Sequence, residues 1–415
     1  MIKLTLFIGG VIKKIQIILL LIFIFFINVS IEYSRFLDFK DEDIFEVKAE
    51  ILNIYPKENF DILKFKTNDF EFFSKLNKNE GLKRLDFISC AIDTRNIDFI
   101  SYLEGFFTNI IYFETLEKNI GFKEKIIKNV ENNHTNEQII ELFNTLFLAI
   151  PVSQNLRDIF INYGISHVVA LSGFHLVVIS FVIYWILYFP YSFFQTKYFP
   201  YRNRRFDILL FTIVVLFYYL ILTDVVPSLL RAFVLFCLGI VLLRSNIKII
   251  SYMTLLYTFL IVIAIYPKYI FSIGFWFSTI AVFYIYLFLQ YFKNLNKLVA
   301  ILFFNFWMFL IFNPIVHLFF YQTTIEQFYS IPITMFFTIF YPFEIFAHIF
   351  NFSNYFDKYI EIFLSYKFYV YEVKTPVWFI IFYLICSFSS IFSNKAFSIL
   401  NILMLGFNTY MYLSF

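Results

Sequence analysis

The chain has 415 residues, of which 60% are hydrophobic and only 15% are charged. With a mean hydropathy of +0.74, it cannot cover two or three soluble domains, the number usual for this length, with a polar surface. The net charge of +3 indicates no class of partner, and the three scattered cysteines, Cys90, Cys237 and Cys386, favour neither a disulfide framework nor a metal cluster. Apolar runs of about 20 residues recur from residue 165 onward, which predicts a polytopic helical membrane protein.

The N-terminal segment carries Lys13 and Lys14 before the apolar run IQIILLLIFIFFINVSI. A secretory signal peptide has this general form, but a small-residue cleavage pattern should follow it, and none does. We therefore predict that residues 1–31 hold an uncleaved first transmembrane helix.

Residues 32–160 are the only polar stretch of domain size in the sequence. The runs FEVKAEILNIY, DILKFKTND and LDFISCAID have the alternation and the flanking turn residues of short strands. Helical pieces are expected near 101–110 and 123–150. We predict a small β-rich domain here, with a helical connection to the segment that follows.

Residues 161–415 are expected to form a multi-helix membrane domain. Together with the first helix they predict a mostly α protein with about ten transmembrane helices. Segment 355–372 is mixed in composition and is expected in the interface. The predicted helices cover roughly 165–190, 206–223, 227–244, 249–266, 270–290, 298–320, 329–350, 376–392 and 396–413.

Basic residues indicate the orientation of these helices, because cytoplasmic loops are enriched in Lys and Arg. If the helices alternate in direction, all the basic clusters fall on one side, which we expect to be the cytoplasm. The N-terminus is then cytoplasmic and the domain at 32–160 lies on the outer side. The clusters are Lys3 with Lys13 and Lys14, the run YRNRR at 201–205, Arg244 with Lys248, and Lys293 with Lys297.

The stretch GISHVVALSGFHLVVIS, residues 164–180, places polar residues at the start of an apolar run. On one continuous helix, His167, Ser172 and His175 fall within an arc of roughly 140° and can share a face. Gly164 and Gly173 also allow a break in the helix, which would give a discontinuous or re-entrant segment; such backbone is tolerated only where protein or water surrounds it. Gly173 also allows another backbone to approach closely. Either way, this polar face should look into a bundle or a cavity.

A second polar feature is DVVPSLLRA, residues 224–232. Pro227 suits the first turn of a helix, where its missing N–H is not needed. Arg231 then lies about one turn inside an apolar run, and an intramembrane arginine is a functional candidate. The alternative is a structural role, either as a partner of Asp224 or with its charged end reaching the outer interface.

Two further stretches carry weaker signals. In YPKYIFSIGFWFSTIAV, residues 266–282, Pro267 ends one helix, and the small residues of the next helix predict close helix packing. These small residues are Ser272, Gly274 and Ser278. In FYSIPITMF, Pro332 is expected to kink or open a helix near the outer side.

Taken in chain order, these stretches resemble the ComEC-type competence proteins, the inner-membrane DNA channels of natural transformation. The family motif G-x-x-H-L-L-A-I-S-G-L-H-V is matched by Gly164, His167, Val168, Val169, Ala170, Leu171, Ser172, Gly173, Phe174, His175 and Leu176. A Pro-Ser pair followed by Arg-Ala is matched by Pro227, Ser228, Arg231 and Ala232. A third motif, S-x-G-F-x-L-S-x-x-A-V, is matched by Ser272, Gly274, Phe275, Ser278, Ala281 and Val282, with Phe277 in place of the usual Leu.

The resemblance extends from about residue 45 to 340, because FISYLEGFFTNI at 99–110 is similar to the end of the outer β-domain of the family. It implies an OB-like outer domain and a competence domain that conducts single-stranded DNA across the bacterial inner (plasma) membrane. Twelve of the residues matched to the three motifs would then line or gate the DNA path. They are Gly164, His167, Ser172, Gly173, His175, Pro227, Ser228, Arg231, Ser272, Gly274, Phe275 and Ser278.

Many family members add a C-terminal metallo-β-lactamase-like domain with an H-x-H-x-D-H motif. The histidines here are not spaced in that way, so we expect a short form that depends on a separate nuclease. The five histidines are His134, His167, His175, His317 and His348.

DNA phosphates need water, polar walls and positive charge along their path. We expect Arg231 to contact phosphate and residues 164–176 to shape or gate the constriction. The sequence has no G-x-x-x-x-G-K loop, so ATP-driven force is expected from another protein. The expected partners are single-stranded DNA, a periplasmic or surface DNA receptor, a cytoplasmic ATP-driven translocase, single-strand-binding proteins, the nuclease and membrane lipid; self-association is left open. No catalytic residue, cofactor or metal is predicted, and we do not expect an enzyme.

Two other functions remain alternatives. A small-solute or ion transporter can use a discontinuous helix, but the inverted repeat that favours that class is not evident. An intramembrane hydrolase can use Ser172 and His175, which are one helical turn apart. A hydrolase also needs an orienting group and an oxyanion site, and the nearest acid, Asp158, lies outside the apolar run.

Overall fold

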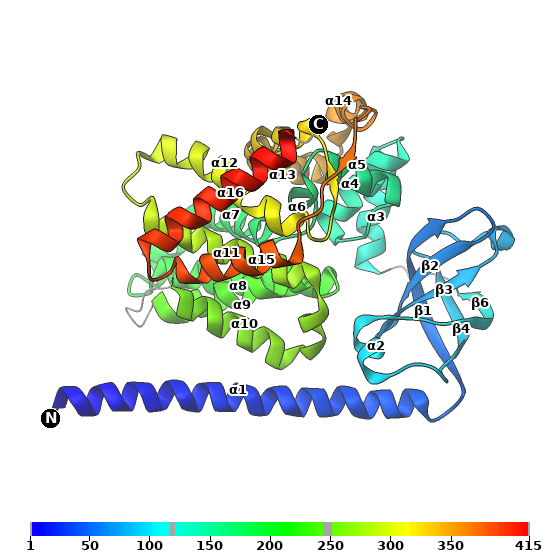
Figure 1. The fold of residues 1–415 in the computed structure, drawn as a ribbon, viewed down its shortest axis with the longest axis horizontal. Coiled ribbons are helices and arrows are strands. Elements are labelled where there is room, and N and C mark those ends of the chain that lie inside the picture. Colours follow the sequence, from blue (N-terminus) through cyan, green and yellow to red (C-terminus); the bar gives the residue numbers. More distant parts are fainter. Residues whose placement is uncertain (1, 117–120, 244–250, 414–415) are drawn as a thin grey trace. The chain divides into compact units, whose positions relative to one another are not determined.

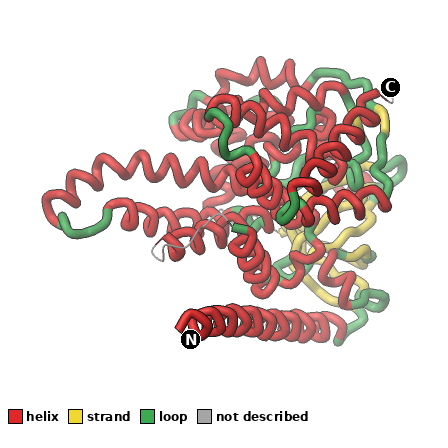
Figure 2. The backbone as a smooth tube through the Cα atoms, turned by 60° about the vertical axis from the view of Figure 1, so that its left-hand side comes forward, coloured by secondary structure: helices red, strands yellow, loops and turns green. Residues whose placement is uncertain are grey.

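The computed structural model describes residues 2–116, 121–243 and 251–413 (Figure 1). Helices make up most of the chain, and strands are concentrated after the first helix (Figure 2). The basic pair Arg244 and Lys248, used above for orientation, lies outside the described residues. Contacts divide the chain into two compact units, which are described separately. Unit 1 comprises Met1–Gly121, Leu230–Ile249 and Met253–Phe277, and unit 2 comprises Phe122–Leu229, Ile250–Tyr252 and Ser278–Phe415.

Unit 1 begins with α1 (Ile2–Lys40), which continues nine residues beyond the predicted boundary at residue 31. Side chains in the last turns of α1 explain why the helix is longer. Phe36 and Phe39 are buried in the core of the β-domain, so the end of the helix is also a part of that domain. Burying two aromatic side chains contributes about 2–3 kcal/mol each and favours the longer helix.

The β-domain has six strands in the order β5-β3-β2-β1-β4-β6. Three of them, β1, β2 and β4, correspond to the three predicted runs, whereas β3, β5 and β6 were not predicted. The helical piece expected near 101–110 is wrong in extent, because α2 (Phe99–Glu104) ends where Gly105 adopts a φ of 103°. The strands are β1 (Ile44–Pro56), β2 (Asp61–Lys66), β3 (Glu71–Leu76), β4 (Phe87–Asp93), β5 (Phe106–Phe107) and β6 (Ile110–Leu116).

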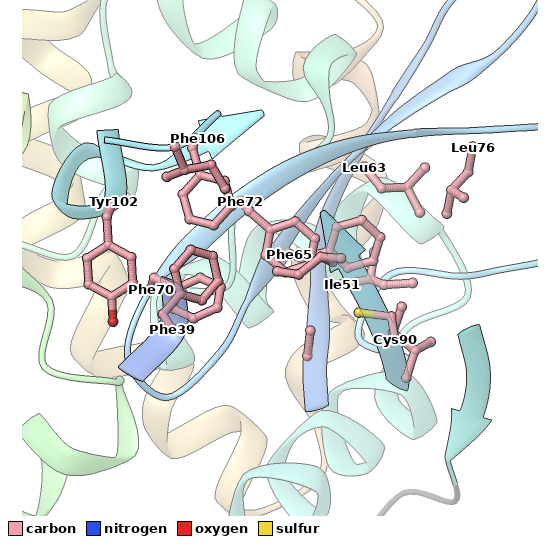
Figure 3. Close-up of a cluster of buried hydrophobic side chains, with 14 of the residues drawn as sticks. Phe39, Ile51, Leu63, Phe65, Phe70, Phe72, Leu76, Cys90, Tyr102 and Phe106 are labelled. Atoms are coloured by element: carbon pink, nitrogen blue, oxygen red, sulfur yellow. The ribbon is translucent and has the colours of Figure 1, made fainter. Parts of the chain in front are cut away.

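One chain segment joins the two edges of this sheet. Its first part, β5, pairs in parallel with β3, and its second part, β6, pairs antiparallel with β4. The interior is aromatic (Figure 3), and Phe72 lies with its ring centroid 4.9 Å from Phe65 and 6.0 Å from Phe106. The two edges of the sheet are thus formed by one continuous segment, and its buried side chains form an apolar core.

The remaining helices of unit 1 are α9 (Pro227–Leu243) and α10 (Tyr252–Ile265), followed by the 3-10 turn η2 (Pro267–Phe271). The side-chain amide of Asn28 in α1 donates to the carbonyl oxygen of Ala264 at 2.6 Å. The end of α10 is therefore held beside the end of the apolar part of α1.

Unit 2 begins with α3 (Phe122–Asn133), α4 (Glu137–Leu148) and α5 (Gln154–Asn162). The first two agree with the helical pieces expected at 123–150, and α5 lies beyond that range. These helices were grouped with the β-domain, but they pack with the membrane helices. Phe143 and Leu146 share one buried cluster with Phe337 and Tyr341 of α13. Apolar residues on one face of α4 explain this packing.

The described residues contain seven helices that are long and apolar enough to cross a membrane, and α9, α10 and α15 are shorter apolar helices. The prediction of a mostly α, multi-pass protein is confirmed. Besides α1, the longer helices are α7 (Gly173–Tyr198), α8 (Arg204–Leu222), α11 (Ile273–Tyr291), α12 (Lys297–Val316), α13 (Ser330–Ile349) and α16 (Asn394–Leu413); α15 is Val377–Ser389.

Polar side chains join the last helices to one another. Asn313 of α12 donates to Asn408 of α16 at 2.6 Å, and the indole of Trp307 donates to Asn401 at 2.9 Å. Hydrogen bonds between helices of this kind hold membrane bundles together. The mixed segment at 355–372 contains α14 (Asp357–Leu364) and β8 (Tyr371–Glu372), which pairs with β7 (Gln322–Thr323).

Candidate functional site

The stretch at 164–176 is broken, as its glycines predict. After α5, Gly164 adopts a φ of 68°, and a single helical turn, α6 (Ser166–Val169), follows. Ala170 is then extended, with φ −62° and ψ 127°, and α7 begins at Gly173. The alternative expectation, one continuous helix with a common polar face, is wrong because the chain leaves the helical conformation between α6 and α7.

Ser172 and His175 form a capping box at the start of α7. The hydroxyl oxygen of Ser172 accepts the backbone N–H of Phe174 at 3.3 Å, and Nδ1 of His175 accepts the backbone N–H of Ser172 at 3.1 Å. In this box the usual Glu or Gln is replaced by histidine. The two side chains thus satisfy backbone donors that a helix start leaves free.

His175 is fully buried. Its ring meets Tyr341 edge-on at 4.7 Å between centroids and lies 5.6 Å from the ring of Phe337, both on α13. Because Nδ1 accepts a hydrogen bond, the neutral ring carries its hydrogen on Nε2. Within the described part of the chain, Nε2 has no hydrogen-bond partner. The site therefore contains a buried N–H donor held in a fixed position.

Gly164 lies against the segment that leads into α13. A Cβ at this position would lie 3.3 Å from the carbonyl oxygen of Gln327 and 3.4 Å from Cβ of Ser330. His167, in contrast, is exposed, and its Nε2 lies 3.3 Å from the hydroxyl of Thr334. The two motif histidines therefore differ in environment, and the expectation that they share a face is wrong.

The start of α9 is attached to the same break. Pro227 is its first residue, as predicted, and the hydroxyl of Ser228 donates to the carbonyl oxygen of Leu171 at 2.7 Å. This carbonyl lies in the non-helical link between α6 and α7. Pro332 is the third residue of α13 and neither kinks nor opens it, because the first turn tolerates proline. Three of the stretches singled out in the sequence thus meet at one place.

Arg231 lies one turn inside α9 and is buried, with 4% of its surface exposed. The carboxylate of Asp224, considered above as its structural partner, accepts a hydrogen bond from Nζ of Lys123 at 2.9 Å. Asp224 has a φ of 56°, so it occupies the tight turn between α8 and α9.

The third motif begins α11. The hydroxyl oxygen of Ser272 accepts the backbone N–H of Phe275 at 3.3 Å, and Phe275 is fully buried with its ring 5.4 Å from that of Phe259. Among the described residues, a Cβ on Gly274 would meet the Ser272 hydroxyl alone within 4 Å, at 3.8 Å. The described surroundings of Gly274 therefore give no example of the close packing expected from Ser272, Gly274 and Ser278. Ser278 lies further along the same helix.

The hydroxyl of Ser172 also lies 3.3 Å from Nδ1 of His175, the nitrogen that accepts the backbone N–H of Ser172, so a serine and a histidine are within reach of each other. A hydrolytic triad needs a carboxylate on the far nitrogen of the histidine. That nitrogen, Nε2, has no hydrogen-bond partner among the described residues. Asp158, the acid considered above, accepts from Gln154 at 2.9 Å on an exposed surface.

The structure also reveals a buried polar cluster that sequence reasoning missed. His134 follows α3, and its Nδ1 lies 2.8 Å from Asp357 of α14. Its Nε2 lies 3.0 Å from Nε2 of His348 in α13, which is four residues after the buried Glu344. The only sequence signal was this Glu-x-x-x-His spacing inside an apolar helix. The described residues contain no group of three or more His, Cys, Asp or Glu suited to hold a metal ion.

A small β-domain on a long apolar helix, followed by an apolar bundle with a capped break, defines a multi-pass membrane protein. The chain belongs to the competence protein family, because the family model described as "Competence protein" matches residues 151–397, which is more than half of its length. The match includes the break, the start of α9 and the start of α11. A role in competence and DNA uptake follows from it. No curated protein and no solved structure matches the chain.

Proposed function

We propose that the protein is the inner-membrane channel that conducts single-stranded DNA into the cytoplasm during natural transformation. The observation that supports this most strongly is the capped break in front of α7, where three family-like stretches meet inside an apolar bundle. Irregular backbone at membrane depth is tolerated only where protein or water surrounds it. A path for a charged strand needs such a place, since phosphates cannot enter hydrocarbon.

Within this proposal the site residues divide into two groups. Arg231 and His167 can donate to phosphate oxygens, as Arg does in single-strand grooves. Gly164, Ser172 and His175 shape the constriction. The full set proposed for the DNA path or its gate is Gly164, His167, Ser172, Gly173, His175, Pro227, Ser228, Arg231, Ser272, Gly274, Phe275 and Ser278.

Arg231 provides the test of this function. Replacing Arg231 by Gln removes the charge and should reduce transformation by about tenfold or more, because hydrogen bonds to a charged group contribute about 1.5–3 kcal/mol. Transformation frequency is measured together with the amount of protein in the membrane fraction and with DNA binding at the cell surface. The matched control is Arg205→Gln, since Arg205 is exposed at the start of α8. Normal transformation of the Arg231 variant would refute the phosphate contact, and normal transformation of a deletion strain would refute the channel.

We also propose that the N-terminus is cytoplasmic and that the β-domain lies outside. The short links after α7 and α11 carry basic residues, as cytoplasmic loops do. The contact between Asn28 and Ala264 supports the alternation of helices on which this depends. If α1 and α10 both run outward, their final turns belong on the same side of the membrane.

The helix predicted at 329–350 corresponds to α13 and was expected to cross the membrane. We propose that α13 lies along the outer ends of its neighbours and does not cross the membrane. Lys123, near the start of α3, binds Asp224 after α8, and Asn129 of α3 donates to Asn351 just after α13. Because α3 has 12 residues, it is about 18 Å long, and five of these residues are charged. Such a helix does not cross the membrane, so the end of α13 belongs on the side of Asp224.

This topology is tested by labelling intact cells with a membrane-impermeant maleimide. In a variant whose three cysteines are replaced by Ser, Lys358→Cys in α14 should be labelled from outside. The matched exposed control, Asn294→Cys between α11 and α12, should be labelled only after the cells are permeabilised. If Lys358→Cys is protected until permeabilisation, α13 crosses the membrane and the proposal is wrong.

A further inference from the structure

The side chains of His134, His348 and Asp357 form a buried cluster. Their contacts need more hydrogens than two neutral imidazoles and a carboxylate carry. Both imidazoles are almost fully buried, at 3% and 5% exposure. They come from segments 214 residues apart and face each other with a distance of 3.0 Å between their Nε2 atoms. The protonation of each ring follows from the partner of its other nitrogen.

The partner of His348 fixes one hydrogen. Nδ1 of His348 lies 2.8 Å from the backbone carbonyl oxygen of Glu344. A carbonyl oxygen can only accept, so Nδ1 carries a hydrogen. In its neutral form, the ring of His348 therefore presents a lone pair at Nε2.

The partner of His134 fixes a second hydrogen. Nδ1 of His134 lies 2.8 Å and 3.0 Å from the two carboxyl oxygens of Asp357, so one hydrogen must lie between the ring and the carboxyl group. The Nε2···Nε2 contact to His348 requires a third hydrogen, because two facing lone pairs repel each other. Two neutral imidazoles and a carboxylate carry only two hydrogens. The three groups together therefore hold one additional proton.

We propose that His134, His348 and Asp357 form a proton-binding site that fastens the end of α3 and the start of α14 to the end of α13. With the proton bound, the cluster of three groups is neutral overall, as an imidazolium–carboxylate pair or as two neutral rings and a carboxylic acid. Without the proton, the cluster has two opposed lone pairs and a net negative charge in a buried place. Loss of the proton at alkaline pH releases the junction.

The groups that line the cluster are mostly neutral. Burial and the nearby Asp357 raise the pKa of the Glu344 carboxyl, which lies 3.6 Å from Nδ1 of His348, to about 8, so this carboxyl is neutral at neutral pH. Phe143 stacks on His134 at 4.8 Å and excludes water. The hydroxyl of Ser353 lies 3.3 Å from Nε2 of His134 and can satisfy only one of the two lone pairs. Two other charged groups lie on α14: Lys358 is exposed, and the carboxyl of Glu361 accepts from Asn136 at 3.1 Å.

This site and the capped break share one helix, because α13 carries both His348 and the rings that enclose His175. If α13 lies on the outer side, as the proposed function has it, the junction responds to the pH outside the membrane. Protonation would then keep the helices around the break docked at neutral and acidic pH. The proton-binding site itself is tested without DNA, so its failure is distinguishable from failure of the channel proposal.

The test uses the purified full chain in detergent, with denaturant unfolding measured at pH values above the pKa of about 8 to which burial raises the Glu344 carboxyl, so that this neighbour adds no slope of its own. The folded site holds one proton that the unfolded chain releases once its histidines are neutral. Stability is therefore complete at lower pH and is lost as pH rises. The unfolding constant should increase by up to tenfold per pH unit above the range in which free histidine titrates.

The variant Asp357→Asn tests whether the additional proton causes the dependence of unfolding on pH. The side-chain amide of Asn can donate to Nδ1 of His134, which leaves the Nε2 hydrogen of that ring to bond to His348. All contacts are then made without the additional proton, so the slope with pH should disappear while the fold persists. His317→Phe is the matched control, since His317 lies 3.0 Å from the carbonyl of Asn313 and 3.1 Å from the hydroxyl of Thr323, which a neutral ring satisfies. That variant should keep the wild-type slope.

Retention of the wild-type slope in Asp357→Asn would overturn the proposal, as would a wild-type chain without a slope. If the Asn variant does not fold, ¹⁵N-histidine NMR of the wild-type chain decides the question. One of the two facing Nε2 atoms should remain protonated at a pH at which the exposed His167 has lost its proton. Two unprotonated Nε2 atoms at that pH would refute the proton-binding site.

Discussion

His175 and the His134–His348 pair are both buried, and both pack against α13. Nδ1 of His175 accepts a backbone N–H only three residues away, so a neutral ring suffices. His134 and His348 instead face each other from distant parts of the chain, and their contact needs a shared proton. The same type of side chain thus forms a fixed cap in one place and a titratable junction in the other.

This difference depends on the partner of each ring and not on burial. A backbone N–H has one protonation state, and the ring of His175 accepts from it as long as that ring is neutral, so the cap does not change as pH rises from neutral to alkaline values. A second imidazole can donate or accept, and the contact between two rings therefore depends on the number of protons bound. The cap should behave as a fixed element of the channel, and the pair as the element that responds to conditions.

The cap can be broken by His175→Leu. The backbone N–H of Ser172 then loses its acceptor in a partly buried place, which costs about 1–3 kcal/mol, whereas the bond from the Phe174 N–H to the Ser172 hydroxyl remains. We expect the free energy of unfolding in detergent to fall by about 1–3 kcal/mol and transformation to fall with it, because the start of α7 is weakened.

His175→Asn is the matched variant, since its side-chain oxygen can still accept from the same N–H. It should recover part of the stability, and neither variant should change the dependence of unfolding on pH in the alkaline range. If His175→Leu removed that dependence, the distinction between a fixed cap and a titratable pair would fail.

Local patterns in the sequence predicted the features that neighbouring residues decide. Apolar runs of sufficient length predicted the multi-pass helical fold. Gly164 and Gly173 predicted the break, and Pro227 predicted the start of α9. In each case the conformational preference of one residue or one short run determines the outcome.

Features decided by distant residues were missed or wrong. The end of α1 at Lys40 depends on the aromatic core of the β-domain. The common face of His167 and His175 depended on a continuous helix, which the glycines interrupt. The contact between His134 and His348 has no counterpart in local sequence, because it exists only after α3 and α13 have packed together.

Gly164 combines both kinds of feature. Its backbone conformation is a local property, whereas the residues it contacts in space are far away in the sequence. Gly164→Ala places a Cβ at a φ of 68° and within 3.3 Å of the Gln327 carbonyl oxygen. The left-handed conformation costs about 1–2 kcal/mol, and the contact forces the segment before α13 to shift. Gly274→Ala is the matched control, since its Cβ meets only a hydroxyl at 3.8 Å and its effect should stay within about 0.5 kcal/mol. We therefore expect denaturant unfolding to show a loss of about 1–2 kcal/mol for the Gly164 variant alone. Equal effects at both positions would mean that the close approach of residues 327–330 does not stabilise the break.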